Sequence, residues 1–334
     1  MLTRSRSINI INICIKQWIK KINNLPSLIY NKHIINYKSL RWFEISDIKN
    51  NEKFNKEREN IISSIINNKL DIKYYKYSVR WNNFKTELDL CLNNIYKQKN
   101  IKNVSTVVCK IKAGRQHTYD FNLLINNKIE IKVEFKFNCN SIMETPQFVQ
   151  PMNPSKWLNI NFEEWFYDNY ISEIVLDTGF LKPDRKEYLK QINNNKVDCM
   201  KLFKKLYDSN ESYNKKCKKI DKTAIKSFIQ ISNVDMNKFS DYLSNSQKDK
   251  IYMYYKNNKF YFGENNENLF KLTKLIKREN TNYIYETLGG MKIEIKLRFK
   301  NGCGLQFPAF QIKRKIPTVN ELKLICKNND IKPP

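Results

Sequence analysis

The sequence predicts an α/β fold in which a helix, a three-stranded antiparallel meander, a second helix and a further strand precede a β-rich C-terminal region. Three observations support this prediction. Apolar residues recur at helical spacing between residues 82 and 97. Three runs with alternating apolar residues follow at 104–112, 118–125 and 129–137. In the last third of the chain, Asn-Asn and Gly-Gly pairs separate short apolar runs, which is typical of β-hairpins.

The composition favours a globular protein with a polyanionic partner. The chain has 334 residues, 41% of them hydrophobic, which is enough to bury a core. Its 60 Lys and Arg residues against 33 Asp and Glu give a net charge of +27, so nucleic acid is the first expected partner and an anionic membrane surface the second. The excess of Asn, Ile, Lys and Tyr indicates AT-rich coding, which accounts for part of the lysine count.

Several function classes are excluded by what the sequence lacks. No apolar run reaches the roughly 18 to 20 residues of a spanning helix, so no membrane crossing is expected. The eight cysteines form no CxxC pair, which argues against a zinc ribbon and favours reduced thiols in an intracellular, reducing compartment. Two histidines are too few for most histidine-based chemistry, and no GxxxxGK[ST] phosphate loop is present.

Residues 1–50 are expected to form a basic N-terminal segment, because positions 1–43 hold eight Lys or Arg and no acid. Three interpretations stay open. Isoleucines at helical spacing fit an ordinary core helix, namely Ile8, Ile11, Ile15 and Ile19. A basic arm lying along phosphates is the second interpretation, and a mitochondrial presequence is the third.

The remaining elements are predicted in chain order from their apolar spacing. Isoleucines between 61 and 66 recur at helical spacing, and the run 71–81, rich in Tyr, Val and Trp, predicts a strand. After the meander, a helix is expected at about 157–170 and a short strand at 173–177. Residues 51–245 would form the catalytic core, with the polar, lysine-rich and partly helical stretch 183–225 as an insertion.

Residues 246–334 are predicted to form an antiparallel, β-rich region that contacts nucleic acid. Its hairpins are expected at 251–255 with 259–262, and at 283–288 with 292–300, followed by a strand over 305–313. Basic side chains interleave with aromatic ones along these strands. The residues expected to contact nucleic acid are Arg298, Lys300 and Lys313.

The hairpin over residues 118–137 has two chemically different faces. From Ile129 to Phe137 the odd positions are apolar, and the even positions alternate between Glu and Lys. A three-residue turn over 126–128 would pair Ile125 with Ile129 and Leu123 with Ile131, so that both apolar faces coincide. This register sets Asp120 opposite Glu134.

Two opposed carboxylates need a cation between them. Side chains directly across an antiparallel pair have Cβ atoms about 4.5–5.5 Å apart, so Asp120 and Glu134 would repel one another if nothing compensated their charge. Mg²⁺ prefers one or two carboxylates together with water and phosphate oxygens. Lys136, on the same face, would orient or polarise the attacking water.

This arrangement resembles the PD-(D/E)xK nuclease superfamily. A helix and a strand come first, an Asp lies on the next strand, and Glu-x-Lys lies on the strand after that. The resemblance covers residues 82–177 and implies a restriction-endonuclease-like core. It implies that Asp120 and Glu134 bind Mg²⁺ or Mn²⁺ and that Lys136 is the catalytic lysine. Glu87 resembles the helical acid that many members add to the metal site, and Gln147 the extra polar residue of some subfamilies. Tyr119 stands where the name-giving proline would be.

The function expected from these residues is metal-dependent hydrolysis of phosphodiester bonds, with DNA as the first substrate. Two further Glu-x-Lys patterns, Glu130 to Lys132 and Glu294 to Lys296, are decoys: the first would lie beside the turn, and the second lacks the preceding helix and strand. The alternative is a non-catalytic, basic nucleic-acid-binding protein in which the charged strand face is simply solvated. A homodimer is compatible with the sequence.

Overall fold

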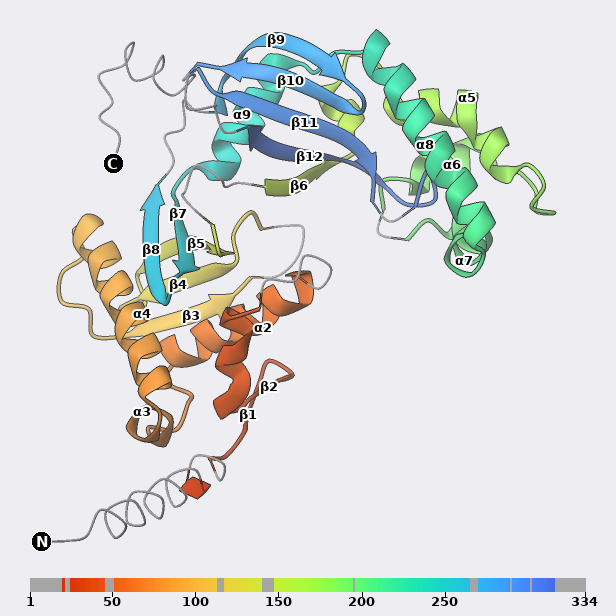
Figure 1. The fold of residues 1–334 in the computed structure, drawn as a ribbon. Helices are drawn as coiled ribbons and strands as arrows, with labels where there is room; N and C mark the ends of the chain where they lie inside the picture. The colour runs from red at the N-terminus through yellow and green to blue at the C-terminus, as the bar shows by residue number, and fades with distance from the viewer. Residues whose placement is uncertain are drawn as a thin grey trace, which may run out of the picture. The chain divides into compact units, whose positions relative to one another are not determined.

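The computed structural model forms two compact units, each with one five-stranded sheet and its own hydrophobic core (Figure 1). The first unit contains residues 1–142 and 249–265, and the second contains 143–248 and 266–334. The structure describes residues 20–21, 25–45, 51–112, 117–139, 147–194, 196–264, 270–288, 290–300 and 302–315. The helix predicted over Ile8 to Ile19 lies outside these ranges.

The described part of the first unit includes a small hairpin, a 3₁₀ helix and three α-helices before its sheet. These are β1 (Leu28–Tyr30), β2 (His33–Ile35), the 3₁₀ helix η1 (Tyr37–Phe43), α2 (Asn51–Ile66), α3 (Lys73–Tyr77) and α4 (Val79–Gln98). The sheet strands are β3 (Val107–Ile111), β4 (Phe121–Ile125), β5 (Ile129–Phe137), β7 (Lys250–Lys256) and β8 (Lys259–Glu264). They are ordered β3-β4-β5-β7-β8, and every neighbouring pair is antiparallel except β5 and β7, which run parallel.

The predicted helix at 82–97 and the three-stranded meander are both confirmed as α4 and β3 to β5. Helix α4 begins where the Ser78 side chain accepts a hydrogen bond from the Trp81 backbone N–H. Its apolar face, including Leu88 and Ile95, is buried in the same core as the odd-numbered side chains of the meander, such as Leu123 and Val133. The period-2 and helical patterns therefore identified the faces that pack together.

Two predicted strands are wrong. Residues 71–81 form α3 and the start of α4, because Tyr74 is fully buried and packs edge-on against Trp81, with ring centroids 5.2 Å apart. Residues 173–177 continue and end a helix, where Ile174 is buried on the helix face. Aromatic residues favoured a strand at 71–81 and branched apolar residues favoured one at 173–177, and helical packing overrode both preferences.

The strand that follows the meander in the sheet is β7. It pairs in parallel with β5 along its whole length, from Lys132 with Lys250 to Phe137 with Tyr255. The Asn257-Asn258 turn that joins β7 to β8 has positive φ at both residues, as a two-residue hairpin requires. The hairpin predicted at 251–262 is thus confirmed, but it belongs to the sheet of the first unit.

The second unit combines helices with an antiparallel sheet. Its helices are α5 (Phe162–Val175), α6 (Arg185–Gln191), α7 (Lys201–Ser209), α8 (Glu211–Ile231) and α9 (Met236–Gln247), with short 3₁₀ helices η3 (Pro154–Trp157) and η4 (Asp198–Met200). Its strands are β6 (Gln147–Met152), β9 (Leu272–Glu279), β10 (Asn282–Thr287), β11 (Lys292–Phe299) and β12 (Pro308–Lys315), ordered β6-β12-β11-β10-β9. The stretch 183–225 is largely helical, as expected.

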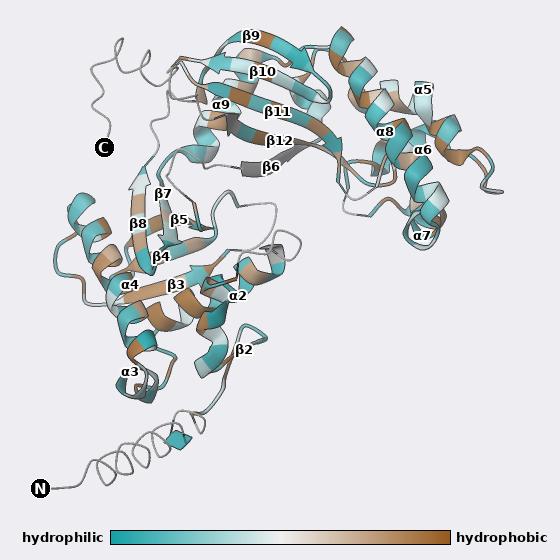
Figure 2. Ribbon diagram, in the orientation of Figure 1, coloured by the Kyte–Doolittle hydropathy of each residue, from teal (hydrophilic) through white to brown (hydrophobic). Residues whose placement is uncertain are grey.

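Hydrophobic and hydrophilic residues alternate along the strands of this second sheet (Figure 2). On β11 the odd positions, such as Ile295 and Leu297, are buried in the core, and the even positions are more exposed. The antiparallel, β-rich character predicted for the end of the chain is confirmed.

The compact units divide the chain differently from the boundaries 51–245 and 246–334. Residues 143–248 share one core with β10 to β12, whereas β7 and β8 complete the sheet that contains the meander. Within the described residues, no helix is both long and apolar enough to span a membrane. The six cysteines that the structure describes carry free thiols.

Candidate active site

The β4–β5 hairpin has the predicted register. Ile125 pairs with Ile129, and Leu123 with Ile131. Asp120 lies just before β4 and outside these pairs. Its backbone N–H donates to the carbonyl of Val133, the residue that pairs with Phe121, at 3.0 Å, and its Oδ2 accepts from the Phe135 backbone N–H. These bonds, to the residues on either side of Glu134, hold Asp120 beside Glu134. The match between two apolar faces and a three-residue turn thus brings the two acids near one another, whereas their direct opposition lies beyond the paired residues and stays a prediction.

Asp120 is half-buried at the end of its strand. Its Oδ2 accepts a hydrogen bond from the Phe135 backbone N–H at 2.8 Å. Burial raises the pKa of Asp120 to about 6, and the charge of Glu134 adds to the rise. The Phe135 hydrogen bond and the charges of Lys136 and Lys250 oppose it.

Glu134 is only 5% exposed, and both of its oxygens contact lysines. The Nζ of Lys136 lies 2.6 Å from Oε1, and the Nζ of Lys250 contacts Oε2. Burial by itself would raise the pKa of Glu134, but the two lysines hold it below its ordinary value. For Lys136, burial is likewise outweighed, because Glu134 and Asp120 raise its pKa. Glu134 is thus held as a carboxylate, and Lys136 as an ammonium.

Lys250 was not identified from the sequence. It begins β7, is 4% exposed, and donates to the Thr118 carbonyl at 2.6 Å as well as to Glu134. Burial lowers the pKa of Lys250 below its ordinary value, although Glu134 opposes the shift. Lys250 thereby links the chain just before β4 with the middle of β5, which fixes the relative positions of the two acidic strands.

Glu59 on α2 is the second residue that sequence reasoning missed. Burial raises the pKa of Glu59 to about 8, and the charge of Asp120 raises it further, against the effects of Lys136 and Lys56. Helix α2 lies along the outer edge of β3 (Figure 1), where Asn67 exchanges two hydrogen bonds of 2.8 Å with the Cys109 backbone. This packing brings the Glu59 carboxyl to the Asp120 side of the sheet.

Glu59 is thus a helical acid whose charge interacts with that of Asp120, and the predicted role of Glu87 in the metal site stays a prediction. Glu87 lies on α4, where its charge acts on Cys91 and Tyr255. The sequence showed an acid on the helix before the meander, but the partner comes from α2, two helices earlier. The available sequence signal for Glu59 was the position of an acid one turn away from the helix face that packs on the edge of a strand.

Gln147 is in the second unit. It begins β6, where its backbone pairs with Lys313 of β12. Its predicted catalytic role stays a prediction. The decoy Glu130 pairs with Leu124 close to the turn and is exposed, as the register argument expected. The other decoy, Glu294, accepts a hydrogen bond from Asn282 at 2.5 Å within the second sheet.

The predicted nucleic-acid contacts lie on or beside β11 and β12. Arg298 and Lys313 share the face of the second sheet opposite its buried odd positions. Arg298 donates to Gln311 at 3.0 Å, and Lys313 is exposed. Lys300 follows β11, with its Nζ 5.9 Å from the centre of the Phe307 ring. Whether these residues contact nucleic acid stays a prediction.

The donor set suits a hard divalent cation that keeps part of its own water. Asp120 and Glu134 offer carboxylate oxygens, which Mg²⁺ and Mn²⁺ prefer. Within the described ranges, no three or more Asp, Glu, His or Cys side chains gather closely enough to hold a metal ion by themselves. A cation that takes its remaining ligands from water and a substrate phosphate fits such a pair.

Comparison with known proteins identifies no relative: no family model, no curated protein and no solved structure matches the chain.

The raised pKa of Glu59 predicts how stability depends on pH. The folded state holds a proton that the unfolded chain loses near pH 4.5, so the stabilisation is complete below pH 4.5 and is lost as pH rises towards 8. Glu59→Gln removes this loss. We expect the variant to exceed the wild type in free energy of unfolding by about 2 kcal/mol at pH 9 and to match it near pH 4.5.

This prediction is checked by urea denaturation in EDTA across pH 4.5–9. Glu130→Gln, which removes an exposed acid from the same unit, is the matched control and should track the wild type throughout. A Glu59→Gln curve parallel to that of the wild type would show that the carboxyl is hydrated and ordinary.

Proposed function

We propose that this chain is a metal-dependent nuclease with a restriction-endonuclease-like core, which hydrolyses phosphodiester bonds in DNA. The observation that carries the proposal is the meeting of Asp120, Glu134 and Lys136 at one end of a mixed sheet. The Glu-x-Lys pattern alone is weak in a lysine-rich chain. Its value here comes from the register that brings Asp120 to it.

The order of elements supports the same proposal. Helix α4 is followed by the antiparallel meander, and β7 then joins β5 in parallel, directly beside the strand that carries Glu134 and Lys136. This resembles the helix, meander and later strand of the PD-(D/E)xK core. The first segment of the second unit, residues 143–248, which includes five α-helices in its described part, stands between β5 and β7 in the sequence.

In the proposed reaction, Asp120 and Glu134 would hold Mg²⁺, which supplies a water of lowered pKa and neutralises charge on the phosphorane-like transition state. Lys136 keeps its positive charge because two nearby carboxylates outweigh the effect of burial, so its Nζ can stabilise phosphate oxygens or orient the attacking water. Lys250 has a side chain that is 2% exposed, so it acts through the position of Glu134 and does not touch substrate.

Removal of the metal tests the proposal. We expect the purified chain to cut plasmid or oligonucleotide DNA with Mg²⁺ or Mn²⁺, and EDTA to lower the rate at least about a hundredfold, because a metal-bound water and the charge clamp would both be lost. Re-addition of Mg²⁺ after dialysis should restore cleavage. Undiminished cleavage in EDTA, or none by the wild type on single-stranded DNA, duplex DNA and RNA, would rule the proposal out.

A second candidate function is non-catalytic binding of nucleic acid. It is favoured by one observation: both Glu134 oxygens are already compensated by lysines, as in a structural ion network. The net charge of +27 serves binding equally well. Binding without cleavage in the metal series above would select this function.

A further inference from the structure

A pocket of about 540 Å³ lies between the β1–β2 hairpin, helix α2 and the outer edge of β3. Its polar lining includes Tyr30, Asn31, His33, Lys56, Glu59 and Lys110. Glu59 is the one acid among the described lining residues, against two lysines, and the lining His33 is paired with Glu57 at 3.0 Å. The pocket therefore favours an anionic ligand that can also accept and donate hydrogen bonds.

The walls of this pocket are held by hydrogen bonds to α2. Asn31 of the hairpin donates to Asn60 at 3.1 Å, and the Tyr30 hydroxyl lies 2.9 Å from that of Ser63. Asn67, also on α2, donates to the Tyr30 hydroxyl at 2.7 Å while bonding the β3 backbone on its other side. The hairpin and the strand edge are thus fixed to one helix, which makes the pocket a preformed site.

Two separate links join the pocket to the candidate active site. On the α2 wall, the charge of Glu59 interacts with those of Asp120 and Lys136. On the β3 wall, Lys110 pairs with Asn122, which lies two residues after Asp120 on the neighbouring strand. Diagonal neighbours of this kind are about 7–8 Å apart. A ligand in the pocket would therefore lie within one nucleotide step of the two acids.

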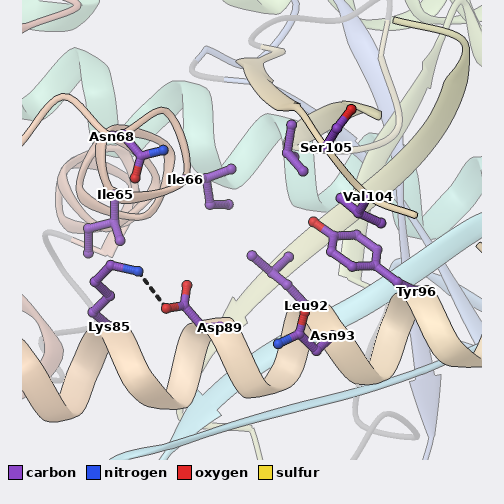
Figure 3. A pocket seen from close by; sticks show the side chains of 11 residues that line it. Ile65, Ile66, Asn68, Lys85, Asp89, Leu92, Asn93, Tyr96, Val104 and Ser105 are labelled. Atoms are coloured by element: carbon purple, nitrogen blue, oxygen red, sulfur yellow. Dashed lines mark hydrogen bonds and ion pairs between the residues drawn. The ribbon is translucent and has the colours of Figure 1, made fainter. Parts of the chain in front are cut away.

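The size of the pocket selects the kind of nucleic acid. Pockets of about 300–1,000 Å³ take molecules of the size of one nucleotide, whereas a duplex needs an open groove. A second pocket of the same unit, about 350 Å³, lies between α2, α4 and the start of β3, and its lining includes Ile65, Leu92 and Ser105 (Figure 3). Its lysine, Lys85, is already paired with Asp89 at 2.5 Å (Figure 3).

We propose that the pocket beside Glu59 binds one unpaired nucleotide next to the bond that is cut, with the phosphates on its two sides held by Lys56 and Lys110, one by each. The substrate class is then single-stranded or locally opened nucleic acid. The position next to a cut bond rests on the proposed nuclease function, whereas binding of the nucleotide requires no catalysis.

The test measures the affinity of a fluorescein-labelled 12-nucleotide DNA strand and of its duplex, in EDTA, at several salt concentrations. Each phosphate contact contributes about 0.7 to the slope of log affinity against log salt for a single strand. We expect Lys110→Ala to weaken single-strand binding about fivefold to tenfold and to lower the slope by about 0.7. The double variant Lys56→Ala/Lys110→Ala should lower it by about 1.4.

The controls separate the pocket from general basicity. Lys85→Ala removes a lysine from the pocket in Figure 3 and should leave affinity and slope unchanged, and Lys110→Arg should restore both. Wild-type single-strand affinity in the double variant, or equal losses in Lys85→Ala, would overturn the inference. Because the assay contains no metal, these outcomes are independent of cleavage. If the chain never cuts nucleic acid but Lys110→Ala lowers the salt slope of single-strand binding, the binding pocket is supported and only the nuclease proposal fails.

Discussion

Replacing Asp120 with asparagine will lower Mg²⁺-dependent cleavage at least about a thousandfold and leave nucleic-acid affinity within about twofold. The amide keeps the size of the side chain and can still accept the hydrogen bond from Phe135, but it carries no charge for a cation. A metal that neutralises developing phosphate charge is worth several kcal/mol, and each 1.4 kcal/mol is about tenfold in rate. Single-turnover cleavage with excess protein measures the effect.

The matched control is the decoy on the same hairpin. Glu130→Gln removes one carboxylate from an exposed position beside the turn, so its cleavage rate should stay within about twofold of the wild type. Lys136→Ala should resemble Asp120→Asn in rate and in retained binding. If Asp120→Asn cuts as fast as Glu130→Gln, the proposed centre does not perform the reaction.

Lys250→Met will destabilise the first unit by about 3 kcal/mol. In this variant Glu134 stays buried, but its Oε2 loses its lysine, so its negative charge is only partly compensated. Removing one partner of a buried ion pair typically costs about 3–5 kcal/mol. The remaining contact with Lys136 reduces the expected loss. The free energy of unfolding from urea denaturation at pH 7, in EDTA, gives the value.

Two further variants test the cause. Glu134→Leu added to Lys250→Met removes the stranded charge and should recover most of the lost stability. Lys99→Met breaks the more exposed pair with Glu264, which is 2.9 Å long, and should cost less than about 1 kcal/mol. A loss in Lys250→Met no larger than that in Lys99→Met would mean that Glu134 is well hydrated in solution.

The parts of the site that could be predicted from the sequence depend on local pattern. The alternation from Ile129 to Phe137 and the turn before it fix the β4–β5 register, and this register brings Asp120, just before β4, close to Glu134. The positions of two other side chains in the site could not be predicted from local sequence pattern. Glu59 reaches Asp120 through packing of α2 on an edge strand, and Lys250 arrives through parallel pairing across a long sequence separation.

The wrong predictions share one physical cause. The runs 71–81 and 173–177 contain aromatic or branched residues that suit a strand when considered alone. In the structure Tyr74 and Ile174 fill gaps in helical cores, and the Trp81 indole nitrogen donates to the Tyr37 carbonyl at 2.9 Å. Burial of these side chains against distant segments decides the local conformation. The residues of a short run contain no information about those distant segments.

The parallel pairing of β7 with β5 also governs when the centre can form during synthesis. A ribosome makes Asp120, Glu134 and Lys136 early, and then makes residues 143–248 before Lys250 exists. Until that point Glu134 has only one of its two lysines, and the nascent sheet ends at an unpaired β5 edge. Maturation of the centre is therefore delayed until most of the polypeptide has been translated, and a chain terminated early would lack it.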